Sequence, residues 1–206
     1  MSAIPKTKLT AAEYLAKERQ AEFRSEFYRG EMFAMAGTSR EHSLIVGNLV
    51  SALVTQFKGR NCEVYPTDMR VKVSASGLYT YPDVVIVCGQ PEFEDAEVDT
   101  LLNPMVLIEV LSPSTESYDR GAKSAQYRRL PSLREYMLIA QDRPQVEVYI
   151  RQDNGDWLLR EASDLDSSVT LSSVSVSLPL SEIYDRIKFE ESAASEIRDP
   201  KAPAVR

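Results

Sequence analysis

The sequence predicts one α/β domain built on a mixed β-sheet, and three observations support this. Helical and extended segments alternate along the chain, as they do where helices cover a sheet. The segments 81–89 and 105–112 are apolar at nearly every position, which is typical of strands buried on both faces. With 206 residues, of which 43% are hydrophobic, the chain can bury a core of its own. We expect this domain to cover 1–189, followed by a loose tail over 190–206.

The N-terminal part of the chain is predicted to form helices over 10–20 and 39–59 and a β-hairpin over 22–37. Thr10 and Glu13 have the spacing of a capping box, which marks the start of the first helix. Aromatic residues on both sides of Arg29-Gly30 favour the hairpin. Apolar residues at helical spacing, with Ser39 placed as the N-cap, favour the second helix.

The rest of the chain is predicted to be mainly extended, with strands in 62–74, 81–89, 105–112, 135–140 and 145–162, and a final strand and short helix within 169–187. Asn154-Gly155 suits a tight hairpin turn in the fifth of these strands. A helix is expected over 114–130, with Ser114 or Thr115 as its cap and an end before Pro131.

Composition limits the classes of function that fit. The net charge of −7 argues against a broad, non-specific surface for nucleic acid, although 120–134 carries a local group of basic residues. The N-terminus has no apolar core of a signal peptide, and no apolar run approaches the ~20 residues of a membrane span. We therefore predict a cytoplasmic protein without membrane contact. Cys62 and Cys88 form neither a CxxC motif nor a disulfide framework, and we interpret them as core thiols.

Each of the two most apolar strands carries one carboxylate, Asp83 in the first and Glu109 in the second. A buried, ionised carboxylate is costly unless it is paired or binds a metal. Either acid alone could lie at a strand end and reach water or a basic neighbour. Two acids on adjacent central strands, with a main-chain carbonyl nearby, suit a hard cation such as Mg²⁺. The chain has one histidine and no closely spaced cysteine pair, so zinc does not fit.

The stretches "YPDVVIV", "LIEVLSPST" and "YDRGAKSAQYRRLPSLREYMLI" resemble the Uma2 family of proposed endonucleases, which belongs to the PD-(D/E)XK nuclease superfamily. The similarity extends over most of the chain before the tail, and Asp119, Lys123 and Tyr127 are part of it. The resemblance implies a restriction-endonuclease-like core: a mixed central sheet flanked by helices, with extra strands at the C-terminal end. It also implies DNA as the substrate, Mg²⁺ or alternatively Mn²⁺ as the cofactor, and a homodimer or another homo-oligomer.

In this superfamily two carboxylates and a main-chain carbonyl hold the metal, and these positions match Asp83, Glu109 and the carbonyl of Val110. The sequence departs from the pattern at Leu111, where the superfamily has a lysine. Lys123 is the candidate to replace it, because it lies on a helical stripe that Tyr127 would anchor to the sheet. A helix lysine exposed to solvent is the alternative.

Five further residues are candidates for the site or for DNA contact, and each also has a structural explanation. His42 could assist a proton transfer, or it could pack or cap at the start of its helix. Glu31 matches a Gly-Glu pair of the family and could join the metal shell, or it could face solvent on the hairpin. The remaining three, which could contact DNA phosphates or be solvated helix charges, are Arg120, Arg128 and Arg129.

The leading hypothesis is therefore a metal-dependent endonuclease that hydrolyses phosphodiester bonds in DNA. The alternative is a nuclease-fold protein without catalysis, which binds nucleic acid or regulates in association with mobile elements. The leucine at position 111 and the negative net charge of the chain favour this alternative slightly. A carboxylate-pair hydrolase of sugars is a third and weaker option, because the chain has a single tryptophan, Trp157, and no evident aromatic platform.

Overall fold

The computed structural model describes residues 8–35 and 37–189, so the tail expected over 190–206 lies outside the described residues. Within the described ranges the strands form a six-stranded sheet, a five-stranded sheet and a two-stranded hairpin. The six-stranded sheet has the order β11 (Trp157–Ala162), β10 (Val146–Arg151), β9 (Glu135–Ala140), β8 (Val106–Leu111), β6 (Val84–Cys88), β3 (Cys62–Pro66). The five-stranded sheet has the order β2 (Glu31–Ala34), β1 (Ser25–Tyr28), β5 (Leu78–Thr80), β4 (Arg70–Val73), β7 (Thr100–Leu101).

The helices are α1 (Ala11–Glu18), α2 (Arg40–Gln56), α3 (Glu116–Tyr118), α4 (Ser124–Tyr127) and α5 (Leu180–Ile183). A π-helical turn, Asp119–Lys123, joins α3 to α4, and a 3₁₀ turn, Ser172–Val174, joins β12 (Ser168–Leu171) to β13 (Val176–Pro179). None of the helices in the described residues is long and apolar enough to cross a membrane.

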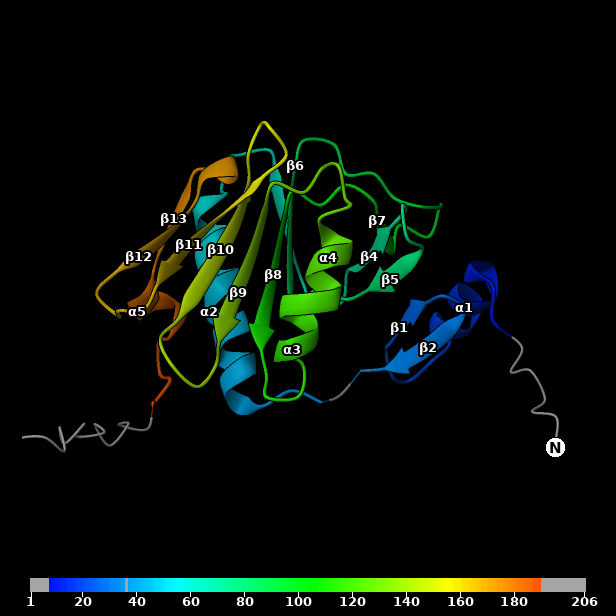
Figure 1. The fold of residues 1–206 in the computed structure, drawn as a ribbon, viewed down its shortest axis with the longest axis horizontal. Helices are drawn as coiled ribbons and strands as arrows, with labels where there is room; N and C mark the ends of the chain where they lie inside the picture. Colours follow the sequence, from blue (N-terminus) through cyan, green and yellow to red (C-terminus); the bar gives the residue numbers. More distant parts are fainter. Residues whose placement is uncertain (1–7, 36, 190–206) are drawn as a thin grey trace, which may run out of the picture.

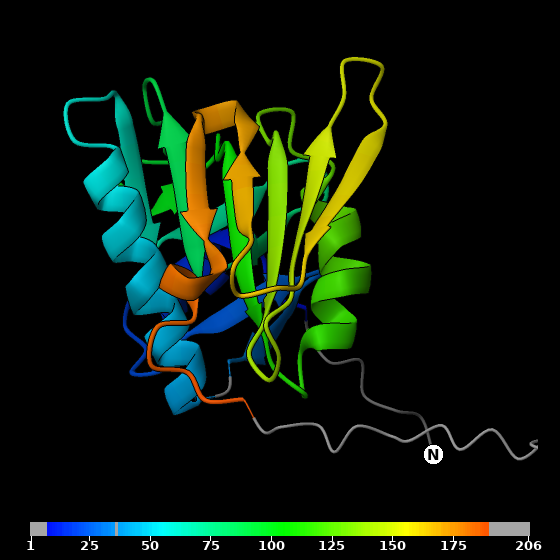
Figure 2. The ribbon, with the colours of Figure 1, turned by 90° about the vertical axis from the view of Figure 1, so that its left-hand side faces the viewer.

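The six-stranded sheet is covered on both faces, as the apolar runs of β6 and β8 predict. One face packs against α2, the β12–β13 hairpin and α5. The other face packs against α4 and residues of the five-stranded sheet. Figure 1 shows the five-stranded sheet and the β1–β2 hairpin beside α3 and α4, and Figure 2 shows the β12–β13 hairpin in front of the six-stranded sheet. β8 and β9 are the parallel pair in this otherwise antiparallel sheet, so the sheet is mixed, as predicted.

The prediction of one central sheet was incomplete, because the chain passes repeatedly between two sheets. The strand expected over 62–74 is divided into β3 and β4, which belong to different sheets. Thr67, between β3 and β4, has a positive φ of 24°. The chain returns from β5 to β6 through Tyr81-Pro82-Asp83, and the Thr67 N–H donates to the Asp83 carbonyl at 2.8 Å. Asp83 therefore lies at the junction of the two sheets.

Most of the N-terminal predictions are confirmed. Thr10 and Glu13 form both hydrogen bonds of a capping box, and the Ser39 side chain accepts the His42 N–H at the start of α2. Arg29 and Gly30 both have positive φ, as a type I′ hairpin turn requires. A Cβ on Gly30 would lie 2.6 Å from the Lys8 Cβ, so this turn needs glycine for two reasons.

Two local predictions were wrong in detail. Cys62 and Cys88 form a disulfide rather than two free thiols, because the antiparallel register of β3 and β6 places them directly opposite each other, with their Cα atoms 4.0 Å apart. The segment 169–187 holds most of a two-stranded hairpin and not a single strand.

Asp99 carries a network of ion pairs that should govern stability in acid. It accepts from Arg19 and from the buried Arg70, each at 2.8 Å, and these guanidinium groups lower the pKa of its carboxyl. A lowered pKa contributes stability above the carboxyl's ordinary pKa, and that stability is lost as the pH falls through the acid range. Asp99→Asn should therefore lower the melting temperature at pH 7 and flatten its decline towards pH 3, as thermal unfolding across pH would show. Asp156→Asn, in an exposed turn, is the matched control; an equal acid decline in wild type and Asp99→Asn would contradict this prediction.

Candidate active site

The two strand carboxylates meet at the edge where the six-stranded sheet borders the five-stranded one. β6 and β8 are antiparallel with Val84 opposite Ile108, so Asp83, the residue before β6, lies across from Glu109. Directly opposed residues of an antiparallel pair have closely spaced Cβ atoms. The prediction that Asp83 and Glu109 come together on adjacent strands is therefore confirmed.

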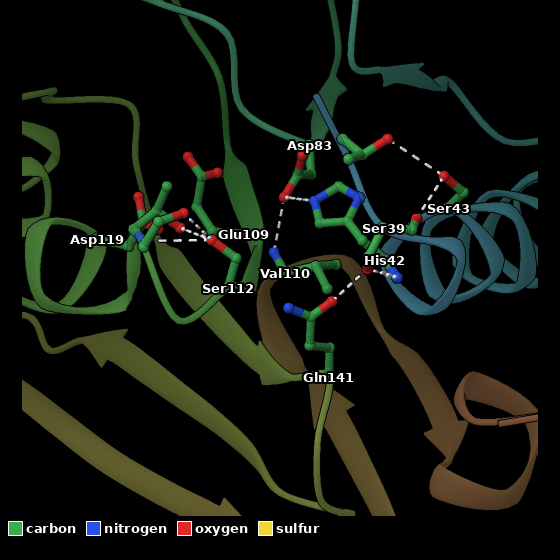
Figure 3. A network of polar contacts seen from close by, with 12 residues as sticks. Ser39, His42, Ser43, Asp83, Glu109, Val110, Ser112, Asp119 and Gln141 are labelled. Carbon is green, nitrogen blue, oxygen red and sulfur yellow. Dashed lines mark hydrogen bonds and ion pairs between the residues drawn. The ribbon is translucent and has the colours of Figure 1, made fainter. Parts of the chain in front are cut away.

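The Asp83 side chain contacts both the start of α2 and the part of β8 that extends beyond its pairing with β6 (Figure 3). Its Oδ2 accepts the main-chain N–H of Val110 at 2.7 Å and lies 3.0 Å from Nε2 of His42. The N–H and C=O of one strand residue point to the same side. The Val110 carbonyl is therefore directed to the same gap beside Asp83, where the ladder between β6 and β8 has ended.

His42 is held in place from behind by the cap of α2. Ser39 accepts the His42 N–H at 3.0 Å, and its own hydroxyl donates to Oε1 of Gln141 at 2.6 Å. Gln141 directly follows β9, so the end of the parallel pair β8–β9 fixes the helix that presents His42 (Figure 3). His42 therefore contacts Asp83 directly, and its role in proton transfer stays a prediction.

Lys123 points into the protein and occupies the centre of a buried cluster of carboxylates. Its Nζ lies 2.9 Å from Oε1 of Glu109, 3.3 Å from Oδ1 of Asp119 and 3.4 Å from Oε1 of Glu26. Asp119 and Lys123 are the two ends of the π-helical turn, a feature that is frequent at functional sites. The helix lysine thus contacts Glu109, whereas Leu111, two residues beyond Glu109 on the strand, lines a cavity of about 110 Å³.

Three hydroxyl groups complete the surroundings of Glu109 and Glu26. Tyr127 donates to Oε1 of Glu109 at 2.7 Å, and its hydroxyl lies 3.4 Å from that of Thr80. Thr80 in turn donates to Glu26 Oε1, and Tyr118 donates to Glu26 Oε2 at 3.1 Å. These contacts link Glu109 to Glu26, and Lys123, which contacts both, closes the ring.

The charges of this cluster do not balance. Burial raises the pKa of Glu109 well above its ordinary value, and the neighbouring Asp119 and Asp83 add to this effect. Burial also raises the pKa of Asp119. Burial alone would lower the pKa of Lys123, but the carboxylates of Glu109, Glu26 and Asp119 raise it well above its ordinary value. One permanent cation therefore faces several acids, of which Glu109 and Asp119 hold their protons to higher pH than exposed carboxyls do.

The arrangement fits the two-carboxylate metal site that the sequence predicts. Among residues 8–35 and 37–189, no group of three or more His, Cys, Asp or Glu side chains could hold a metal ion. In this part of the chain, Oδ1 of Asp83 and Oε2 of Glu109 have no hydrogen-bond partner. These two oxygens and the Val110 carbonyl are the kind of ligands that Mg²⁺ prefers. A divalent cation there would be stabilised by these carboxylates as they lose their protons.

The structure does not bring the other candidates into the cluster. Glu31 is exposed on the edge strand β2. The guanidinium of Arg120 is held by Glu116 at 2.8 Å and by Glu147 at 2.6 Å. Arg128 and Arg129 are exposed at the end of α4, where Arg128 donates to the hydroxyl of its helix neighbour Ser124 at 2.9 Å.

Sequence reasoning missed Glu26, which the structure places against Lys123. The residue lies on β1 in the predicted hairpin, five positions before the Glu31 that was chosen instead. The available signal was the alternation of β1: Glu26 and Tyr28 share one face, while Phe27 turns to the core. This pattern shows that Glu26 lies on a different face from Phe27, but it does not show what that face contacts.

The chain matches a known protein family over most of its length. Residues 11–181 match the family model of Uma2, described as "Putative restriction endonuclease". The chain belongs to the Uma2 family. Its resemblance to that family, noted from three stretches of sequence, is thereby confirmed.

The Uma2 relatives include two from Synechocystis. "Uncharacterized protein sll1609" is 38% identical over 173 residues, which cover 84% of this chain and 98% of that protein. "Uncharacterized protein slr1290" is 33% identical over 187 residues, which cover 90% of this chain and 96% of that protein. A crystal structure from Anabaena variabilis, described as "a putative nuclease belonging to DUF820", has the same fold, with a TM-score of 0.70 and 20% identity over 85% of this chain and 97% of that one.

Proposed function

We propose that this Uma2 protein is a metal-dependent endonuclease that hydrolyses phosphodiester bonds in DNA. One observation carries the proposal: Lys123 Nζ lies 2.9 Å from Oε1 of Glu109, although the usual lysine position is Leu111. A cation at this distance from a metal-binding carboxylate restores the charge pattern of a PD-(D/E)XK site. It also weakens the main argument for a nuclease fold without catalysis.

Asp83, Glu109 and the Val110 carbonyl would hold Mg²⁺, or alternatively Mn²⁺. The bound metal would lower the pKa of a water molecule and neutralise charge on the phosphate. The protein's own groups would supply the rest. Lys123 would place a positive charge beside the developing negative charge of the phosphoryl oxygens. His42, whose Nε2 lies 3.0 Å from Oδ2 of Asp83, is placed to accept or donate a proton at the edge of the site.

Tyr127 has a positioning role in this proposal. Burial raises the pKa of its hydroxyl, so the group stays neutral and keeps donating to Oε1 of Glu109. Together with Lys123 it fixes one carboxylate oxygen and leaves the other for the metal. The exposed Arg128 and Arg129 would contact the phosphate backbone, which would make binding depend on salt. Arg120 could join them only by leaving its two glutamate partners.

The test is incubation of purified protein with supercoiled plasmid and short DNA, with Mg²⁺, with Mn²⁺ and with EDTA. Wild type should nick or cut the DNA in either metal but not in EDTA, while Asp83→Ala and Glu109→Ala should lose this activity. Glu161→Ala, an exposed acid on β11, is the matched control and should cut like wild type. Equal cutting by all four proteins would point to a contaminant and overturn the proposal. DNA binding without any cutting would support the non-catalytic alternative.

A further inference from the structure

Three exposed side chains, Phe33, Met35 and Tyr118, lie on or directly after the elements that meet at the Lys123 cluster, and we call them the apolar rim. Their exposed fractions are 50%, 39% and 39%. Large apolar side chains that stay exposed around a functional site often mark a surface for a ligand. The proposed chemistry at Lys123 and Glu109 does not use them.

The pairing of the β1–β2 hairpin places Phe33 beside the site. Phe33 is directly opposite Glu26, and directly opposed residues of an antiparallel pair project from the same face. Glu26 faces Lys123 at 3.4 Å, so the Phe33 ring lies on the face of the hairpin that is turned to the cluster. Met35 is two residues further along the chain, directly after β2, and its N–H donates to the Arg24 carbonyl at 3.0 Å.

Tyr118 forms the opposite part of the rim, on α3. Its hydroxyl donates to Oε2 of Glu26 at 3.1 Å, and its ring centroid is 5.9 Å from Nζ of Lys123. Tyr118 thus lies near the buried lysine, while Tyr118 itself remains partly exposed. Figure 1 shows the hairpin and α3 side by side, so the rim spans two elements that are distant in sequence.

We propose that the apolar rim stacks against unpaired bases, and that the substrate is a nucleic-acid strand with unpaired nucleotides next to the bond that is cut. This inference rests on the proposed nuclease function. An aromatic ring can stack on any base whose face is free, whereas the bases of an intact duplex cover one another's faces. The rim adjoins Lys123, so a base stacked there would belong to the strand whose phosphate lies at the cluster.

The size of the rim favours this occupant over a second protein. Stable protein interfaces bury about 800 Å² on each partner, over some 20 to 30 residues. The rim consists of three side chains, which suits one or two bases better. The rim lies next to the carboxylates. This position also fits a nucleotide whose phosphate approaches the metal site and whose base turns outward.

The test measures binding and cleavage separately. Fluorescence anisotropy in Ca²⁺ buffer would compare a labelled oligothymidylate of about 20 nucleotides with a duplex of equal length. Wild type should prefer the single strand. Phe33→Ala should weaken single-strand binding about tenfold, in the range found for loss of one base stack, and should leave duplex binding unchanged. Phe33→Trp should retain the preference, and Leu158→Ala, a residue 45% exposed on the edge strand β11, should behave like wild type.

Several results would overturn the inference. They are equal binding of single strand and duplex, no binding of either, or an effect of Phe33→Ala no larger than that of Leu158→Ala. A lower mass of Phe33→Ala than of wild type in light scattering would show that the rim joins two copies of the chain. The two proposals can fail independently. Uncut plasmid together with Phe33-dependent binding of the single strand would overturn only the nuclease function. Plasmid cutting without a preference for single-stranded over duplex DNA would overturn only the base-stacking role of the apolar rim.

Discussion

Lys123→Met should lower the rate of DNA cleavage by about a hundredfold or more, the size of effect seen when one electrostatic contact to a transition state is removed. The same variant should bind Mn²⁺ at least as tightly as wild type. Nζ of Lys123 is the cation that faces Glu109, Asp119 and Glu26, and its removal makes their surroundings more negative. A lysine that served only to hold the fold would not produce this combination of lost rate and retained metal.

Cleavage rates and calorimetric Mn²⁺ titrations of the same preparations would check this prediction. Lys58→Met is the matched control, because Lys58 is exposed just beyond the other end of α2. Leu111→Lys in the Lys123→Met background offers a second test, since it returns a lysine to the strand position that the superfamily uses. Partial recovery of cutting is expected there. Unchanged cleavage in Lys123→Met would remove the main support for the proposed chemistry.

Metal affinity should rise steeply with pH, by about tenfold per pH unit where one proton is displaced. Burial raises the pKa of Glu109, so in the metal-free protein this carboxyl keeps its proton to higher pH than an exposed glutamate does. A metal ligand must be deprotonated, and Mn²⁺ therefore competes with that proton. Lower pH favours the protonated form of Glu109 and weakens Mn²⁺ binding, whereas higher pH strengthens Mn²⁺ binding.

Isothermal titration with Mn²⁺ across pH, in two buffers of different ionisation enthalpy, would count the protons released. Glu109→Gln should bind Mn²⁺ weakly and lose most of the pH dependence, because the amide has no proton to displace. In wild type, the rise in melting temperature on adding Mn²⁺ should be larger at pH 8 than at pH 6 for the same reason. An affinity that does not change with pH would mean that Glu109 is not a ligand or is already ionised.

Local signals in the sequence predicted the helices and the two central carboxylates. The capping box at Thr10 and the Ser39 cap depend on residues three apart, which the sequence displays directly. Asp83 and Glu109 were recognisable because each interrupts an apolar strand. The inward direction of Lys123 followed from the helical stripe that it shares with Tyr127, and the structure confirms it.

Contacts between distant segments could not be predicted in the same way. The crossing at Thr67 that divides one expected strand between two sheets depends on which partners β3 and β4 find. The Cys62–Cys88 disulfide follows from the register of β3 and β6, which the spacing of two cysteines does not reveal. Glu26 reaches Lys123 only because the hairpin docks beside α3. In each case the decisive information is the pairing of segments far apart in sequence.

The docking of the β1–β2 hairpin determines how easily Glu26 can separate from Lys123. Between β1 and the rest of the five-stranded sheet, the described ladder consists of one residue pair, Phe27 with Tyr79. Segments with few backbone contacts open locally at lower free energy than the core. Opening here would withdraw Glu26 from Lys123 while Asp83 and Glu109, on the six-stranded sheet, stay in register. Heat should then remove Glu26 from the cluster before the protein melts, through the departure of the β1–β2 hairpin from the rest of its sheet.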